Sequence, residues 1–443
     1  MKNILILGAG KSASTLIRYM AQASGELDAE ITVADMSESL AAQKTEGAHR
    51  THATGIDITD AASRSKEIQQ ADIVISLLPP HLHELAADTC LEMGRNLVTA
   101  SYTSDAMKAK HKQVAGKDLI FLNEAGLDPG IDHMSAMQVL DRLRDEGANI
   151  TAFRSYCGGL VDPESVDSPW GYKFTWNPRN VVMAGQGTAK YIENGHYKYI
   201  PYNRLFAETT MTEVEGHGFF EGYANRDSLS YREAYGLTHI PTIIRGTLRV
   251  PGFCQGWNAF VKLGWTDDSC IIADADKHTY TSLLDAYLPA ATENEGIHER
   301  AMTFLNPTGD PGLTEKLEWL GLFDHIPLKG KNTSAAGHLQ ALLEEKWALH
   351  KGDIDMIVMQ HQFEFEQKGQ QVYLASSLVV KGDDNIHTAM SKTVGLPLGI
   401  CAKLILQGKV KERGVLIPTT EDIYVPVLKE LESFGIRFTE TEY

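Results

Sequence analysis

The chain has 443 residues, more than one hydrophobic core usually supports, so we expect two or more domains. Hydrophobic residues make up 43% and charged residues 22% of it, which is typical of a globular enzyme. The net charge of −17 argues against nucleic acid or an anionic membrane as a partner, because both require clustered Lys and Arg.

The cysteines and histidines give no sign of a metal site. The five cysteines are scattered and form no Cys-x-x-Cys pair, so we expect reduced thiols and a cytoplasmic location. His81, His83 and His133 have no metal-ligand spacing with any Cys or acid cluster. The apolar start, Ile4–Leu7, is too short for a signal peptide, and we find no run of about 18 apolar residues that predicts a membrane span.

Residues 1 to about 130 alternate short apolar strands with helical patterns, which predicts a doubly wound parallel sheet. A further strand is expected around Thr54, ending at Asp57. The other predicted strands are Asn3–Leu7, Glu30–Ala34, Ile73–Leu77, Asn96–Ala100 and Leu119–Leu122.

A glycine turn follows the first strand and precedes a helical pattern. It contains Gly8, Gly10, Lys11 and Ser12, and it fits the G-x-G-x-x-G/A sequence with Ala13 in the third place. Glycine lets the backbone approach a pyrophosphate, which then lies at the helix N-terminus. This pattern predicts a Rossmann domain that binds a dinucleotide, although a glycine loop without a nucleotide is the alternative.

The residues at the end of the second strand indicate which dinucleotide the domain binds. Asp35 stands about 20 residues beyond the turn, where an acid usually binds the ribose hydroxyls of NAD. Its carboxylate would repel the 2′-phosphate of NADP, and Met36 follows in place of an arginine. We therefore expect NAD to be preferred, with NADP still possible. The alternative is that Asp35 only caps the next helix.

Asp128 follows the last strand of this region. Gly126 ends the strand segment, and Asp128-Pro-Gly130 opens a helix. Ligands of open α/β sheets lie beyond the carboxyl ends of the strands, so Asp128 is well placed to face a nicotinamide. Its alternative role is that of a helix N-cap.

The pattern changes from about residue 150. Tyr, Trp, Gly and Pro become frequent, and we expect longer strands in a larger mixed sheet, with few helices until Ser282. Helical periodicity returns in Met390–Leu406 and Ile423–Phe434. The predicted α/β fold is therefore a Rossmann domain of residues 1–130 and 390–443, with a second α/β domain, 131–389, inserted in it.

Several blocks of the chain resemble saccharopine dehydrogenase of the L-glutamate-forming type, also called saccharopine reductase. These blocks span much of the chain in the family's order. They are Ala100–Tyr102, Leu127–His133, Ser155–Leu160, Trp170–Trp176, Asn225–Ser228 and Arg245–Arg249. The resemblance implies reversible oxidation of saccharopine to L-glutamate and 2-aminoadipate 6-semialdehyde in lysine metabolism. A homodimer is a possible assembly.

The resemblance also implies roles for individual residues. Asp128, Tyr102 and Cys157 match positions of substrate contact and acid–base work. Residues expected to line the cofactor, mainly through backbone groups, are Asp57, Leu77, Ala100, Gly126 and Leu127. Those expected to contact the substrate are Ser101, Tyr102, Asp128, Trp176, Arg226, Thr247, Leu248 and Arg249, with the two arginines binding carboxylates.

The chain departs from the family at Met36, at Asp162 and at Pro80, where an aromatic residue is common. Fungal NADP-linked members carry an arginine where Met36 stands, whereas the animal bifunctional enzyme resembles this chain there and works with NAD. Asp162 adds a carboxylate near the expected substrate site. Two other functions stay open: an imine reductase similar to carboxynorspermidine dehydrogenase, and a non-catalytic protein that binds NAD.

Overall fold

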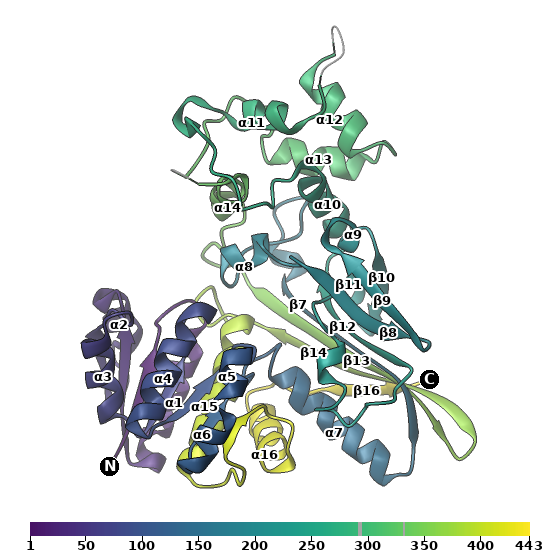
Figure 1. Ribbon diagram of the computed structural model, residues 1–443. Coiled ribbons are helices and arrows are strands. Elements are labelled where there is room, and N and C mark those ends of the chain that lie inside the picture. Colours follow the sequence, from purple (N-terminus) through teal and green to yellow (C-terminus); the bar gives the residue numbers. More distant parts are fainter. Residues whose placement is uncertain (291–294, 331–332) are drawn as a thin grey trace. The chain divides into compact units, whose positions relative to one another are not determined.

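The computed structural model describes residues 1–290, 295–330 and 333–443 (Figure 1). The chain divides into two compact units. Unit 1 contains residues 1–150 and 365–443, and unit 2 contains residues 151–364.

Unit 1 is built on a seven-stranded sheet with the order β15-β6-β5-β4-β1-β2-β3, in which every neighbouring pair is parallel. The predicted doubly wound parallel sheet is thus confirmed. The strand order reverses between β1 and β4, where folds of this kind bind their ligands. The strands are β1 (Lys2–Leu7), β2 (Ala29–Asp35), β3 (Thr51–Gly55), β4 (Ile73–Ser76), β5 (Asn96–Thr99), β6 (Ile120–Leu122) and β15 (Gly414–Leu416).

Helices flank this sheet because its strands are apolar on both faces, as buried parallel strands usually are. On one face, Leu5 and Leu7 share a hydrophobic core with buried side chains of α3, α4 and α6. The helices of unit 1 are α1 (Ala13–Leu27), α2 (Glu38–Thr45), α3 (Ala61–Gln70), α4 (His83–Met93), α5 (Asp105–Ala109), α6 (His111–Gly116), α7 (Ile131–Asp145), α15 (Ala389–Leu406) and α16 (Glu421–Glu432).

The C-terminal helix α15 packs closely on α1. A Cβ on Gly395 would lie 2.8 Å from the backbone N of Leu16, and one on Gly399 would lie 2.6 Å from the Tyr19 ring, so glycine is needed at both positions. The C-terminal tail therefore packs back onto helix α1 of unit 1. In length and composition α15 resembles a membrane span, but 78% of it is buried inside the protein, as in a core helix.

One prediction about secondary structure was wrong. The third strand does not extend to Asp57 but covers Thr51–Gly55, because the Asp57 carboxylate accepts hydrogen bonds from the N–H and hydroxyl of Thr59 and closes a turn. The stretch before Ser282 has few helices, as the sequence predicted, and the longest of them is α10 (Phe253–Leu263). This helix starts after Gly252 and stops at Gly264, both in the left-handed region.

Unit 2 contains the predicted mixed sheet, with the strand order β10-β11-β12-β7-β13. The β7–β12 pair is parallel, whereas β10–β11 and β11–β12 are antiparallel. A β8–β9 hairpin joins this sheet through β12. The strands are β7 (Asn149–Val161), β8 (Thr188–Glu193), β9 (His196–Pro201), β10 (Thr209–Val214), β11 (Gly218–Ala224), β12 (Thr242–Arg249) and β13 (Asp355–Gln367). In unit 1, β14 (Gln370–Lys381) pairs with β16 (Thr439–Glu442).

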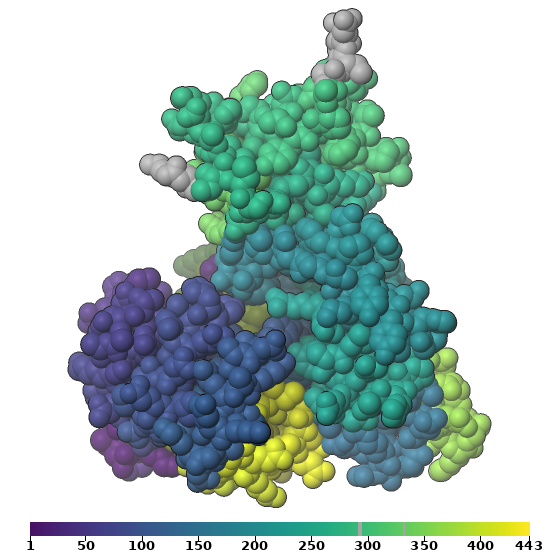
Figure 2. Space-filling view, in the orientation of Figure 1, coloured from purple at the N-terminus to yellow at the C-terminus, as the bar shows by residue number. Residues whose placement is uncertain are grey.

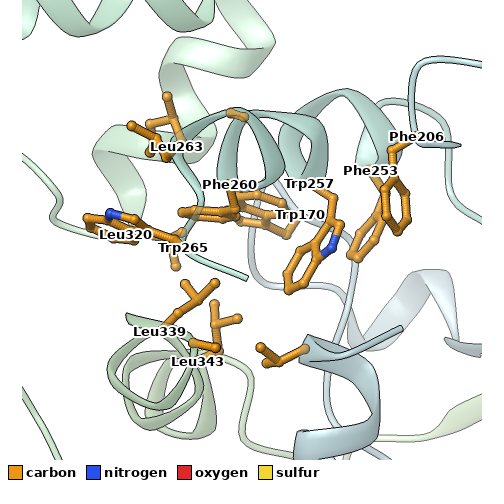
Figure 3. Close-up of a cluster of buried hydrophobic side chains, with 14 of the residues drawn as sticks. Trp170, Phe206, Phe253, Trp257, Phe260, Leu263, Trp265, Leu320, Leu339 and Leu343 are labelled. Carbon is orange, nitrogen blue, oxygen red and sulfur yellow. The ribbon is translucent and has the colours of Figure 1, made fainter. Parts of the chain in front are cut away.

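The helices of unit 2 enclose an aromatic core (Figure 3). The rings of Trp170 and Phe260 stack with centroids 5.8 Å apart, and those of Phe253 and Trp257 stack at 5.9 Å. Helices α11, α12, α13 and α14 lie at one end of the unit 2 sheet (Figure 1), and their atoms belong to the green region of Figure 2. These helices are α8 (Pro178–Val182), α9 (Tyr202–Leu205), α10, α11 (Tyr280–Tyr287), α12 (Ile297–Leu305), α13 (Pro311–Trp319) and α14 (Ala335–Lys346).

Candidate active site

The glycine turn has the geometry that a dinucleotide requires. Gly8 has φ +103°, and a Cβ there would lie 3.1 Å from the carbonyl oxygen of Leu77. At Gly10, a Cβ would meet no described atom within 4 Å, so a ligand can approach the backbone. Ser12 precedes α1 without a side-chain cap; of the first helical N–H groups, that of Ala13 donates to the carbonyl oxygen of Gly10 and that of Thr15 donates to Ser391 Oγ, both at 3.1 Å. The residues of the turn therefore fit the predicted cofactor.

Asp35 lies directly against this turn. Its Oδ2 accepts a hydrogen bond of 2.8 Å from the backbone N of Ala9, and its Oδ1 accepts one of 2.9 Å from the backbone N of Ser37. The N-cap of α2 is Ser37, whose hydroxyl accepts from the N of Leu40. The alternative role of Asp35 as the N-cap of this helix is therefore wrong. Met36 is 82% exposed.

Other predicted cofactor residues lie at the carboxyl ends of the strands. Leu77, which follows β4, contacts Gly8. A Cβ on Gly126 would lie 2.8 Å from the Cβ of Ala100, so these two residues are also neighbours, and Leu127 next to them is buried. Asp57 lies apart from these pairs, exposed, after the edge strand β3.

The side chains of Tyr102 and Asp128 contact each other. The Tyr102 hydroxyl donates a hydrogen bond of 3.1 Å to Asp128 Oδ1, and both side chains are partly exposed. The N-cap of α7 is Gly130, and Gly130 N donates to Asp132 Oδ1 at 2.6 Å. The alternative role of Asp128 as a helix cap is therefore wrong. A phenol paired with a carboxylate can relay a proton.

Sequence reasoning missed Glu124, which supports this pair. Its Oε1 accepts hydrogen bonds from the backbone N and the hydroxyl of Thr103, and its Oε2 lies 2.8 Å from His133 Nε2. Burial raises the pKa of Glu124. The hydrogen bonds from His133 and Thr103 and the charge of His133 outweigh this effect and lower the pKa to about 2. A lone Glu after a strand gives no signal of this role in the sequence.

Sequence reasoning considered His83 only as a metal ligand. Its Nδ1 lies 2.8 Å from the Ser76 hydroxyl, and its Nε2 lies 2.6 Å from the Ser101 hydroxyl. Burial, with a smaller contribution from His81, lowers the pKa of His83 to about 4, so the imidazole is neutral near pH 7. Among the described residues there is no group of three or more His, Cys, Asp or Glu that could hold a metal ion.

In unit 2, three neighbouring strands align Cys157, Thr247 and Tyr223. Thr247 on β12 stands opposite Cys157 on β7 and Tyr223 on β11. Arg249 lies two residues beyond Thr247 and therefore on the same face of the sheet. Leu248, between them, is fully buried. The sheet thus brings together the predicted Cys157, Thr247 and Arg249.

The Arg249 guanidinium is enclosed by aromatic rings. Its Cζ lies 5.3 Å from the ring centroids of Tyr172 and Phe253 and 5.9 Å from that of Tyr223. Within the described part of the chain it forms no salt bridge, and its buried Nε has no hydrogen-bond partner. A buried cation without a carboxylate is costly, so this arrangement suits an anionic ligand.

Arg226 and Trp176 lie at other positions of unit 2. Arg226 is exposed, with φ +48°, and the adjacent Asp227 pairs with Lys190 at 3.0 Å. Trp176 is half-buried and packs against the aromatic core of unit 2.

Comparison with protein-family models covers both halves of the chain. The model of the saccharopine dehydrogenase NADP binding domain matches residues 4–122, and that of the saccharopine dehydrogenase C-terminal domain matches residues 126–436. The chain belongs to the saccharopine dehydrogenase family. The resemblance that the sequence motifs indicated is thereby confirmed.

Individual members of this family are similar over the whole chain. Saccharopine dehydrogenase (NADP(+), L-glutamate-forming) of Schizosaccharomyces pombe is 32% identical, over 99% of both chains. Mitochondrial alpha-aminoadipic semialdehyde synthase of Mus musculus is 34% identical over 99% of this chain, which spans only 47% of that protein. The apo structure of saccharopine dehydrogenase (L-Glu forming) from Saccharomyces cerevisiae matches with a TM-score of 0.89 and 31% identity over 100% of both chains.

Many of the predicted residues of this saccharopine dehydrogenase family member form two groups, one in each unit, whereas Asp57, Arg226 and Trp176 belong to neither. The first lies at the strand ends of unit 1 and contains the glycine turn, Asp35 and the Tyr102–Asp128 pair. The second lies on one face of the unit 2 sheet and contains Cys157, Thr247 and Arg249.

Proposed function

We propose that the protein is an NAD-linked saccharopine dehydrogenase that releases L-glutamate and 2-aminoadipate 6-semialdehyde. The printed activity of the fungal relatives supports this substrate, since the chain aligns with 99% of the S. pombe enzyme. The observation that carries the proposal is the hydrogen bond between Tyr102 and Asp128, because it provides a proton-transferring pair at the strand ends of a dinucleotide fold.

The reaction consumes saccharopine, NAD and water and yields L-glutamate, the semialdehyde, NADH and a proton. The bound nicotinamide supplies the hydride acceptor for the carbon next to the secondary amine. Asp128 and Tyr102 then exchange protons with the imine nitrogen and with the water that adds to the imine carbon. The carbinolamine loses its amine as the nitrogen is protonated, and the aldehyde forms.

Arginine side chains bind the carboxylates of the substrate in this proposal. Arg249 is the stronger candidate, because its guanidinium is buried among aromatic rings and forms no salt bridge with any described residue. Arg226, exposed on the same unit, is the second candidate. Cys157 contributes to the lining near Arg249 and is a weaker candidate for acid–base work, because buried thiols usually act as small apolar groups.

We propose NAD as the preferred cofactor, although the relatives' names specify NADP. Asp35 is held at the glycine turn by Ala9, where its carboxylate can accept hydrogen bonds from ribose hydroxyls and would repel a 2′-phosphate. Met36 provides no cation there. We also keep a cytoplasmic location and a homodimer as proposals, the former on account of five free cysteines.

Turnover tests the proposal directly. Purified protein with saccharopine and NAD should produce NADH, measured by absorbance, and an equal amount of L-glutamate. Tight NADH binding without turnover would favour the non-catalytic alternative. Oxidation of carboxynorspermidine in place of saccharopine would favour the polyamine-type reductase. A higher kcat/KM with NADP than with NAD would contradict the cofactor preference alone.

A further inference from the structure

We propose that His83 is a positioning residue that orients the Ser101 hydroxyl and sets whether this hydroxyl donates or accepts a hydrogen bond toward the substrate. The inference rests on the proposed function, because it assigns a task to Ser101 in that reaction. It concerns a buried imidazole to which neither the motifs nor the proposed chemistry gives a role.

The geometry places His83 between the ends of two neighbouring strands. Ser76 is the last residue of β4, and Ser101 follows the end of β5. The imidazole spans them, with Nδ1 at 2.8 Å from Ser76 Oγ and Nε2 at 2.6 Å from Ser101 Oγ. The side chain is buried at the N-terminus of α4, so packing fixes the ring.

The backbone of Ser101 has hydrogen-bond partners of its own, one of which, Thr99 Oγ1, also lies 3.4 Å from both ring nitrogens of His83. Its N–H donates to Thr99 Oγ1 at 3.2 Å, and its carbonyl accepts from the N of Glu124 at 3.1 Å. Within the described residues, His83 is the hydrogen-bond partner of the hydroxyl itself. Because Ser101 is partly exposed, its Oγ can form a further hydrogen bond with a bound substrate.

A neutral imidazole carries one donor and one acceptor nitrogen, and this links the two serines. If Nε2 accepts from Ser101, the Ser101 oxygen is left to accept from a ligand, for example from an ammonium group. If Nε2 carries the proton, the Ser101 O–H is free to donate to a carboxylate or to a deprotonated nitrogen. A shift of the proton from one ring nitrogen to the other, matched by rotation of the serine hydroxyls, converts one arrangement into the other.

A double-mutant cycle tests the proposal with saccharopine and NAD. His83→Ala and Ser101→Ala should each lower kcat/KM for saccharopine by about 5- to 100-fold, as expected when a partner of a buried polar group is lost. The double variant should be no slower than the slower single variant, because His83 acts through Ser101. His83→Gln, whose amide can reach Ser101, should recover part of the loss. The dissociation constant of NADH should stay unchanged in all variants.

The matched control is His81→Ala, which removes an exposed imidazole two residues away and should leave kcat/KM unchanged. If the effects of His83→Ala and Ser101→Ala multiply in the double variant, or if His83→Ala leaves kcat/KM unchanged, the proposal is overturned. A parallel fall in melting temperature without rescue by His83→Gln would show a purely structural role instead.

A second measurement does not depend on turnover and keeps this proposal separate from the proposed function. In protein labelled with 15N-histidine, the ring nitrogens of His83 are assigned by their loss in His83→Gln. Ser101→Ala should shift these signals, and saccharopine should shift them in the wild-type protein only. Unchanged His83 signals in Ser101→Ala would overturn the proposal even if the wild-type enzyme turns over saccharopine. A protein that shows the shift in Ser101→Ala without any turnover would contradict the proposed function alone.

Discussion

Glu124 Oε2 lies 2.8 Å from His133 Nε2, and both side chains are buried within unit 1. The other carboxylate oxygen of Glu124 holds Thr103, the residue after Tyr102. His133 belongs to the first turn of α7, just after Asp128. Glu124 therefore ties the segment that carries Tyr102 to the helix start that carries Asp128, and so fixes the distance between them.

Acid should weaken the fold through Glu124. Its pKa in the folded protein, about 2, is below the ordinary value of 4.5, so its stabilisation is complete above the unfolded pKa. The stabilisation is lost as the pH falls from there to the folded pKa. Glu124→Gln should lower the free energy of unfolding at pH 7 by about 1–3 kcal/mol and reduce its pH dependence below pH 5, measured by urea denaturation. Equal pH dependence in both proteins would contradict the assignment.

The Tyr102–Asp128 pair should affect turnover and leave the fold intact. Asp128→Asn should lower kcat by about 10²- to 10⁴-fold, since it removes a group that exchanges protons. Tyr102→Phe should have a smaller effect in the same direction, because it removes one partner of the pair. The melting temperature should change little, since Gly130 and not Asp128 is the N-cap of α7.

The control for this pair is Asp105→Asn, an exposed carboxylate that pairs with Lys108 on α5. It should leave steady-state kinetics unchanged. If Asp128→Asn keeps normal kcat but melts at a lower temperature, Asp128 has a structural role only.

Arg249 should control the affinity for saccharopine and not for the cofactor. Arg249→Met keeps an apolar stem among the rings of Tyr172 and Phe253 but removes the charge. KM for saccharopine should rise by about 10- to 150-fold, which corresponds to a charge-assisted contact of about 1.5–3 kcal/mol. NADH binding, followed by fluorescence, should be unchanged.

Arg154→Met provides the comparison, because Arg154 on β7 already pairs with Glu364 at 2.5 Å. Its loss should leave KM unchanged. An unchanged KM in Arg249→Met would show that the cage of aromatic rings holds a structural arginine.

The sequence predicted the parts of the fold that depend on local pattern. Five of the parallel strands were predicted from their apolar runs. The glycine turn was predicted from the spacing of its glycines between a strand and a helix. The third strand was misplaced because Asp57 closes a turn with its own neighbour Thr59, which outweighs the apolar Ile56 and Ile58. Strand β15 was not predicted, since a three-residue strand in the tail carries no periodic signal.

Site residues could be predicted from the sequence only where they belong to a recognisable motif. Tyr102 and Asp128 are 26 positions apart, and their contact depends on how β5 and β6 align. His83 and Glu124 were missed because each acts through contacts with other segments, and a lone His at a helix start or a lone Glu after a strand has many structural roles. Asp162, expected as an extra charge near the substrate, is buried and accepts a hydrogen bond from the N of Glu164 at the start of a short 3₁₀ helix. Its effect on the substrate stays a prediction.

Cofactor choice can be tested at the two residues after β2. Met36 is exposed, so Met36→Arg adds a guanidinium without disturbing the core, and Asp35→Asn removes the repelling charge but keeps an acceptor for Ala9 N. The double variant should shift the ratio of kcat/KM for NADP over NAD upward by about 10- to 100-fold, since each charge contact with a phosphate contributes about 1.5–3 kcal/mol. Met36→Leu is the matched control and should keep the wild-type ratio. If the wild-type protein already prefers NADP, or the double variant gains nothing with NADP, the 2′-phosphate is recognised elsewhere and Asp35 does not determine the choice.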